Sequence, residues 1–367
     1  MFPLFPHFIY KDFVFVLFAH FFCAQCHRRW QEPTERIPDY TSYETIVVAG
    51  FPSGDKRIVF AQMEGMTGLK TIDSWDVKML GKANEPFIKG NYPHAEGTWG
   101  WGTSADKVVL AVRNIRATMV EYHAIKFDLG YPRNYRETQL RTDMLFSNFD
   151  NPDAQRDFLE WRDMKVIGEI KRYGWFIDYW MEGGLLRDIS SNQPTTLAHW
   201  EMLRNPLEFS TEQSLAQFQA DREAGIVDTY DQLCVNGTLS NGCEPVEVIC
   251  SDSILDPVMA RPQIQKIGNL LQSLDGVQDY LIAEDAWDCI WNELVVNRKG
   301  SMMDREKYNL EDYVFPRHIL EAMLDELNRL ITKYSQIPWL GQSNAGSLVM
   351  ILSMHRTGIQ NELASMP

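Results

Sequence analysis

Short apolar runs alternate with amphipathic segments along this chain, and the alternation predicts strands and helices in turn. The predicted strands are residues 45–50 (TIVVAG), 86–89 (PFIK), 107–112 (KVVLAV) and 246–250 (VEVIC). The predicted helices are residues 57–67, a segment from Asn114 to about Lys126, and residues 262–274 and 316–334. Such alternation implies right-handed crossovers between parallel strands. The sequence therefore predicts an α/β fold, with a parallel sheet flanked by helices in three layers.

The 367 residues are enough for one large domain, and no convincing inter-domain linker divides them. A polar, proline-containing linker is predicted at 27–44, and the domain itself at 45–340. Residues 150–225 are predicted as a mostly helical insertion, whose many Trp and Tyr side chains indicate core packing, with a substrate wall as the alternative. The C-terminal segment 341–367 is expected to pack on the domain.

The N-terminal segment carries an apolar run at 13–24 (FVFVLFAHFFCA), broken only by His20 and followed by basic residues. The run is shorter than the roughly 20 residues that cross a bilayer, which favours a cleaved signal peptide. Extending it back to Phe8 makes a poor signal-anchor. Residues 1–26 are therefore predicted as a signal peptide or signal-anchor, and a buried apolar segment is the alternative.

The pattern of cysteines also indicates that the protein is exported into the secretory pathway. Residues 234–243 (CVNGTLSNGC) hold two Asn-Gly turn signals between two cysteines, so the chain can double back and pair Cys234 with Cys243. The same turn contains a glycosylation sequon at Asn236. Together these features predict a disulfide-bonded glycoprotein of the secretory pathway, in the Golgi lumen or secreted. A cytosolic protein with free thiols is the alternative.

The formal net charge of −15 argues against nucleic acid as a partner, because such partners select a basic face. An anionic cofactor would have to be held by a few convergent basic side chains and backbone N–H groups. Two places in the sequence offer such groups, and both follow predicted strands.

The first is the loop between the strand at 45–50 and the helix that follows. Its candidate cofactor-binding residues are Pro52, Ser53, Gly54, Asp55, Lys56 and Arg57. Glycines let the backbone approach a phosphate, and the helix start adds N–H groups and partial positive charge. The loop is not a Walker A motif, since three residues rather than four separate Gly50 from Gly54 and Arg57 follows Lys56. An ordinary strand-to-helix turn is the alternative.

The second is Arg113, directly after the strand at 107–112. An arginine at the carboxyl end of a parallel strand faces the crevice where α/β sheets bind ligands, and it can contact phosphate bidentately. A surface ion pair is the alternative. A weaker signal is the loop formed by Arg298, Lys299 and Gly300, since most such basic pairs are simply solvated.

In order along the chain, these pieces resemble the P-loop sulfotransferase family. Residues 51–56 (FPSGDK) correspond to its 5′-phosphosulfate loop, 88–93 (IKGNYP) to its I-K-T-H-x-P strand, and 112–117 (VRNIRA) to its V-R-N-P-x-D segment. Residues 248–255 correspond to its Y-E-D-L-type strand, and 298–300 to its R-K-G loop. The resemblance implies a P-loop nucleoside-triphosphate-hydrolase-like fold, with Arg113, Arg298, Lys299 and Gly300 at the 3′-phosphate.

The catalytic positions depart from that pattern. The family's loop lysine, which neutralises the leaving oxygen, corresponds to Ser53, and Lys56 three residues on is the expected substitute. The family's histidine base corresponds to Asn91, so His94 is expected to accept the proton, with Asp55 or Glu96 as alternatives. A family serine after the phosphate-binding arginine corresponds to Glu121, whose charge would oppose a phosphate unless it turns away.

The resemblance implies an enzyme that transfers a sulfuryl group from 3′-phosphoadenosine-5′-phosphosulfate to a hydroxyl of a glycan, protein or small acceptor. No metal is expected. Two alternatives stay open, which are a weak or inactive nucleotide-binding family member and another P-loop transferase or kinase. An N-terminal membrane anchor is a possible further association, and the sequence does not determine the oligomeric state.

Overall fold

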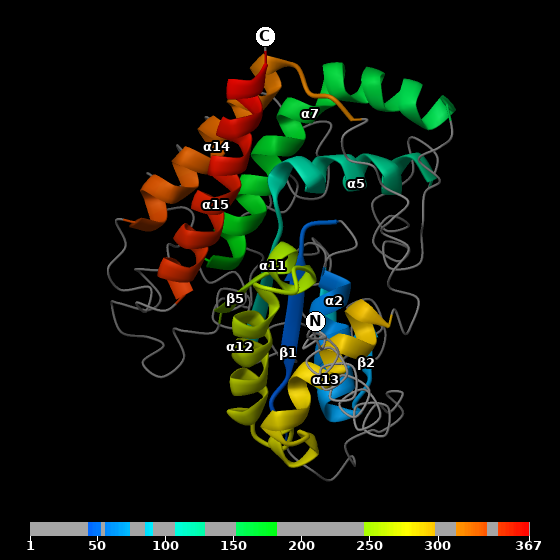
Figure 1. Ribbon diagram of the computed structural model, residues 1–367, viewed down its shortest axis with the longest axis vertical. Coiled ribbons are helices and arrows are strands. Elements are labelled where there is room, and N and C mark those ends of the chain that lie inside the picture. The colour runs from blue at the N-terminus through cyan, green and yellow to red at the C-terminus, as the bar shows by residue number, and fades with distance from the viewer. Residues whose placement is uncertain are drawn as a thin grey trace, which may run out of the picture.

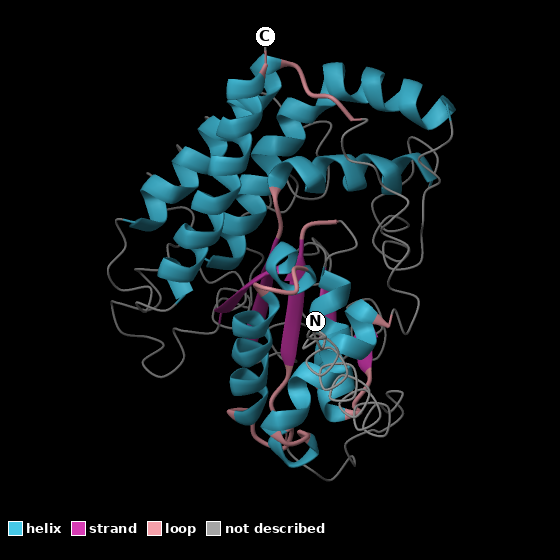
Figure 2. Cartoon of the chain, in the orientation of Figure 1, coloured by secondary structure: helices cyan, strands magenta, loops and turns pink. Residues whose placement is uncertain are grey.

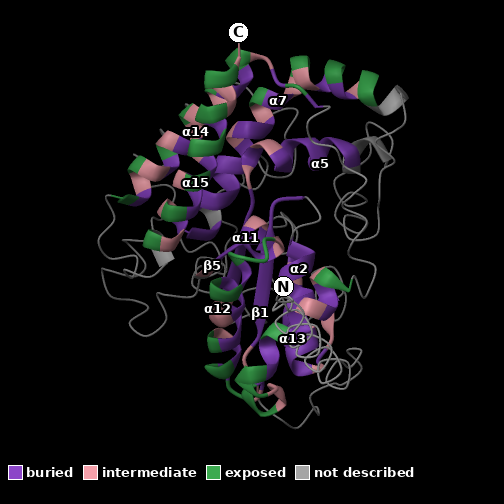
Figure 3. Cartoon of the chain, in the orientation of Figure 1, coloured by how far each residue is buried: buried purple, intermediate pink, exposed green. Residues whose placement is uncertain are grey.

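A five-stranded parallel sheet forms the centre of the protein (Figures 1 and 2). The structure is a computed structural model that describes residues 43–52, 56–73, 85–90, 107–128, 152–181, 246–297, 313–335 and 344–366. The strands are β1 (Ile46–Gly50), β2 (Thr71–Asp73), β3 (Phe87–Gly90), β4 (Lys107–Val112) and β5 (Val246–Cys250), in the order β2-β3-β1-β4-β5. Central β1 pairs with β3 and β4 and is buried along its whole length (Figure 3).

Helices cover both faces of the sheet because successive strand residues point to opposite sides. Val47 and Ala49 face one apolar cluster, and Ile46 and Val48 face the other. The first cluster includes side chains of α5 (Ile115–Asp128), α7 (Pro152–Met181), α14 (Arg317–Ser335) and α15 (Asn344–Ser365). The second includes side chains of α2 (Lys56–Thr67), α12 (Ala260–Gln272) and α13 (Trp287–Trp291). The predicted layered α/β architecture is confirmed at this level.

The remaining described elements connect β5 and α13 to their neighbours. They are α11 (Ser251–Leu255), the short helices η2 (Gln278–Tyr280) and η3 (Glu284–Ala286), and the π-helical turn η4 (Asn292–Val296). Close packing between α12 and α13 depends on Gly268, because a Cβ there would lie 2.2 Å from a ring carbon of Trp287.

All four predicted strands are present, and both β4 and β5 have the predicted bounds. The sequence reading missed β2 and α15. Only three residues make up β2, which is too short for a periodic signal. In α15, Val349, Met350, Ile351 and Leu352 are consecutive apolar residues, so no single stripe stands out, and Met350 is exposed. The aromatic side chains of α7 pack in the core as predicted, including Trp161, Tyr173, Trp175 and Trp180.

Several predicted features lie outside the described residues. They are the N-terminal segment 1–26, most of the linker 27–44, the helical region beyond α7 and the cysteine turn at 234–243. Among the helices of the described segments, none combines the length and the apolar character that a membrane crossing requires.

Candidate functional site

The candidate site lies where β1 and β4 end side by side. The chain leaves β1 for α2 and then β2 on one side of the sheet, whereas β4 leads through α5 towards β5 on the other side. This change of direction makes the β1–β4 boundary a topological switch point. In open α/β sheets, ligands bind outside the carboxyl ends of the strands at such a point.

A small cavity opens at this point, and residues of five elements and their ends line it, namely β1, α2, β4, α5 and α7. Gly50 ends β1 and Phe51 follows it, Lys56 begins α2, and Arg113 follows β4. Tyr173, Phe176 and Ile177 of α7 close the far side. The cavity measures about 10 Å³, which is about the room of one water molecule. It is therefore too small to hold a nucleotide by itself.

Gly50 allows α2 to start close to the end of β1. A Cβ at this position would lie 2.8 Å from the Lys56 Cβ, so a larger residue would push the helix start away. Lys56 is only 2% exposed and lines the cavity. Pro52 and Arg57 are also buried beside it. A buried cation at a helix N-terminus suits an anion, because the helix dipole and N–H groups add to its charge.

Arg113 is buried and already has acidic partners. Its guanidinium forms an ion pair with Glu121 of α5, and its Nε lies 3.5 Å from Asp252 Oδ1 of α11. Burial alone would lower the pKa of Arg113, but Glu121 and Asp252 outweigh burial and raise it above its ordinary value. The Glu121 side chain faces Arg113, whereas a phosphate bound at Arg113 would require that side chain to point away. A phosphate at Arg113 must therefore compete with the Glu121 carboxylate.

Neighbouring contacts hold the end of β4 in place. Tyr173 donates a hydrogen bond from its hydroxyl to the backbone oxygen of Arg113 at 2.7 Å. The Asn114 N–H donates to Asp252 Oδ2 at 2.7 Å. Burial would raise the pKa of Asp252, but His355, Arg113 and the Asn114 N–H together lower it, so the carboxylate is ionised near neutral pH.

Thr118 is a candidate ligand residue that sequence reasoning missed. It lies on α5, is fully buried and lines the cavity, yet its hydroxyl makes no hydrogen bond within the described residues. A buried hydroxyl without a partner is costly, so a group of a bound ligand is a natural partner. A lone threonine inside a helix carries no sequence signal, and only its place beside the cavity identifies it.

Arg172 is a second buried cation that the sequence did not single out. It lies on α7, pairs with Glu169 at 2.9 Å and contacts the Tyr122 hydroxyl. Its guanidinium lies 5.7 Å from the centre of the Phe51 ring, directly behind the cavity lining. Arg172 could not be singled out from the sequence because it lies within an aromatic-rich helical segment, where cations usually face solvent.

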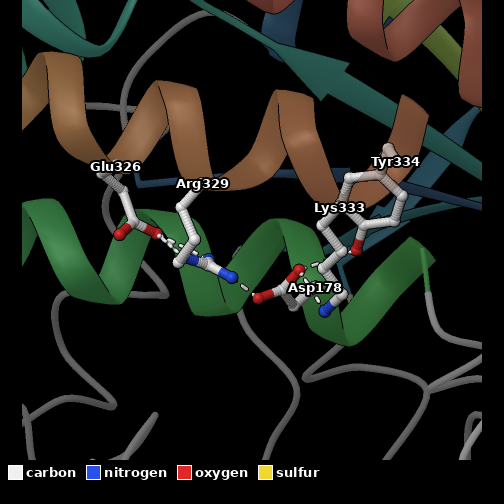
Figure 4. Close-up of polar contacts among 5 residues, drawn as sticks. All are labelled: Asp178, Glu326, Arg329, Lys333 and Tyr334. Atoms are coloured by element: carbon white, nitrogen blue, oxygen red, sulfur yellow. Dashed lines mark hydrogen bonds and ion pairs between the residues drawn. The ribbon is translucent and has the colours of Figure 1, made fainter. Parts of the chain in front are cut away.

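A buried polar network fixes the α7 wall of the cavity against α14 (Figure 4). Asp178 Oδ1 accepts hydrogen bonds from Lys333 Nζ at 2.8 Å and from the Tyr334 hydroxyl at 2.7 Å. Asp178 Oδ2 lies 2.8 Å from Arg329 Nη2, which also contacts Glu326. Burial would raise the pKa of Asp178, but Lys333 and Arg329 lower it to about 2.

The structure brings together only part of the predicted site. Lys56 and Arg113 line the same cavity, and Arg57 and Pro52 are adjacent in sequence to lining residues. The other predicted residues lie outside the described part of the chain and stay predictions, namely Ser53, Gly54, Asp55, His94, Arg298, Lys299 and Gly300.

Two of the cysteines can be placed. Cys250 is free and buried, and Cys289 is disulfide-bonded. The predicted pairing of Cys234 with Cys243 lies outside the described residues and stays a prediction.

Neither a known family, nor a curated protein, nor a solved structure matches this chain. The class that the described residues define is an α/β protein with a parallel sheet and a basic cavity at its switch point.

Proposed function

We propose that this chain is a P-loop sulfotransferase of the secretory pathway. It binds 3′-phosphoadenosine-5′-phosphosulfate at the carboxyl ends of β1 and β4 and transfers the sulfuryl group to a hydroxyl. The acceptor is a glycan, a protein or a small molecule in the Golgi lumen or outside the cell. The bonded Cys289 supports an oxidising compartment, where disulfides persist.

One observation carries the proposal. Lys56 and Arg113 come from different strand ends, yet both line one cavity at the switch point of the sheet. Lys56 begins a helix, where a phosphate gains from the N–H groups and the dipole, and Arg113 follows the adjacent strand. Two cations that converge from separate segments suit an anionic group such as a phosphate of the cofactor.

The ion pair between Arg113 and Glu121 determines how the nucleotide binds. The Glu121 carboxylate forms an ion pair with Arg113, so a 3′-phosphate has to displace it. This competition lowers the affinity for the nucleotide and favours the second candidate function, a family member with weak or no activity. We therefore expect Glu121→Gln to tighten nucleotide binding, because the neutral amide competes less for the guanidinium.

Thermal unfolding of the full chain with 3′-phosphoadenosine-5′-phosphate tests nucleotide binding. The 3′-phosphorylated nucleotide should raise the melting temperature more than ADP does, by mass action on the folded state. Arg113→Ala should abolish that preference, since a charge-assisted contact to phosphate is worth about 1.5–3 kcal/mol. Arg298→Ala is expected to act in the same direction. Equal stabilisation by ADP would contradict the proposal and favour a kinase-like protein.

The matched control for Glu121→Gln is Glu169→Gln. Glu169 is also a buried partner of a buried arginine, but its partner Arg172 lies behind the cavity lining. Both variants lose one buried charge, and only Glu121→Gln should change the affinity for the 3′-phosphorylated nucleotide. A similar change in both variants would mean that a general charge effect, rather than competition at Arg113, controls binding.

Catalysis is assigned to two side chains. Lys56 stabilises the departing phosphate oxygen, and His94 accepts the proton of the attacking hydroxyl as the sulfur–oxygen bond to the acceptor forms. Each contribution is typically worth about a hundredfold or more in rate. Lys56→Ala and His94→Ala should each reduce labelled-sulfate transfer by that factor, and only Lys56→Ala should also weaken nucleotide binding. A chain that binds the nucleotide but transfers no sulfate supports the binding-only function.

A further inference from the structure

The carboxyl end of β5 brings together a thiol, a carboxylate and an imidazole. Cys250 is the last residue of β5, Asp252 lies in the first turn of α11, and His355 lies on α15. The ligand atoms of these three side chains all lie within 4.8 Å of one another. The three residue types include a soft sulfur and an imidazole nitrogen, so the group differs from a cluster of surface acids.

His355 and Asp252 are in direct contact. His355 Nε2 lies 3.3 Å from Asp252 Oδ2, and the imidazole is only 4% exposed. In a tetrahedral zinc site, bond lengths of about 2.0–2.3 Å separate neighbouring ligand atoms by roughly 3.3–3.5 Å. The observed 3.3 Å matches that separation.

We propose that Cys250, Asp252 and His355 bind a zinc ion. Thiolate, imidazole and carboxylate are the ligands that zinc prefers, whereas calcium and magnesium select oxygen atoms alone. The site is distinct from the cavity at the β1–β4 boundary, and the proposal does not depend on the sulfotransferase function. It also differs from the sequence-based expectation of no metal, because the third ligand lies on a helix that the sequence did not predict.

The charges around the three residues allow a divalent ion. Zinc and Arg113 together carry three positive charges, and a Cys250 thiolate, Asp252 and Glu121 together carry three negative charges. Zinc binds deprotonated ligands and releases their protons, so the positive and negative charges are equal when the ion is bound. Asp252 is the least buried of the three, with a side chain 35% exposed, and it offers the ion a path from solvent.

The surroundings also orient the Asp252 carboxylate. The Asn114 N–H donates to Oδ2 at 2.7 Å, and Arg113 Nε lies 3.5 Å from Oδ1. Metal-binding carboxylates commonly have such outer partners, which fix the direction of the ligand oxygen. A zinc ion here would connect the C-terminal helix α15 to β5 and α11. The competing explanation is a metal-free polar cluster that makes the same connection.

Cobalt substitution of the full chain distinguishes these explanations. The protein is stripped with a strong chelator, without reductant so that disulfides stay closed, and is then titrated with Co²⁺. Zinc binding at Cys250 predicts a thiolate-to-cobalt charge-transfer absorption that Zn²⁺ displaces, and Zn²⁺ should raise the melting temperature. Cys250→Ser should remove the absorption. Asp252→Asn and His355→Ala should each weaken zinc binding by more than the 10–100-fold typical of outer partners.

The matched control is His123→Ala. His123 is also a buried histidine beside a carboxylate, with Nε2 2.8 Å from Asp157 Oδ2, but it lies on α5 outside the cluster. This variant should keep the zinc affinity of the wild-type chain. An equal loss of affinity in His123→Ala and His355→Ala would overturn the proposal.

The absence of the cobalt–thiolate absorption in the wild-type chain, together with a melting temperature unaffected by Zn²⁺, would also overturn it. If Cys250→Ser does not fold, alkylation decides the thiol's role. Zn²⁺ should protect the Cys250 thiol of the wild-type chain from alkylation during mild thermal opening. Alkylation at the same rate with and without Zn²⁺ would refute the assignment.

Discussion

Asp178→Asn tests how firmly the α7 wall of the candidate site is held (Figure 4). The substitution keeps the shape of the side chain and an oxygen that can accept from Tyr334, but it removes the charge that faces Lys333 and Arg329. The Asp178 side chain is only 10% exposed, so solvent screens these contacts weakly.

The magnitude follows from the depressed pKa. A fall from the ordinary 3.8 to about 2 corresponds to about 2.5 kcal/mol, since a tenfold change in proton affinity is worth about 1.4 kcal/mol. Because the folded-state pKa of Asp178 lies below the unfolded-state value, this stabilisation is complete above a pH of about 4. It is lost as the pH falls through about 2.

Urea unfolding of both chains from a pH of about 6 down to about 2 measures the difference. Asp178→Asn should lower the free energy of unfolding by about 2–3 kcal/mol at the upper end, and the gap should close as Asp178 of the wild-type chain becomes protonated. The control is Asp163→Asn on the same helix, whose exposed carboxylate pairs with Arg162 and should contribute little. A gap between wild type and Asp178→Asn that stays constant across the pH range would refute the reasoning.

Two further predictions concern packing and cysteines. Gly268→Ala should destabilise the protein by about 1–3 kcal/mol in urea unfolding, because the new Cβ meets an indole carbon at 2.2 Å. Gly346→Ala, in a helix with nothing within 4 Å of its Cβ, should instead stabilise by about 0.5–1 kcal/mol, and loss of stability in both variants would contradict the packing argument. Peptide mapping without reduction checks the predicted Cys234–Cys243 pair. A peptide that links Cys289 to either of those two would disprove that pairing.

The sequence alone predicted the elements whose local pattern is strong. The run at 107–112 has β4's bounds, because it is apolar from Val108 onward and ends at a basic residue. The stripe of α14 and the strand–loop–helix unit around Gly50 were equally visible. Alternation of these elements was enough to predict a parallel sheet with helices on both faces. Lys56 and Arg113 could be proposed as a pair because strand ends in a parallel sheet meet at one edge.

Tertiary structure alone decided which side chains meet at that edge. Glu121 of α5 pairs with Arg113, and Thr118 of the same helix lines the cavity. His355 meets Cys250 only because α15 packs against β5, although a long stretch of chain separates them. Contacts of this kind depend on how the crossovers and helices dock rather than on local spacing, because the apolar stripes that drive docking do not specify which polar groups become neighbours.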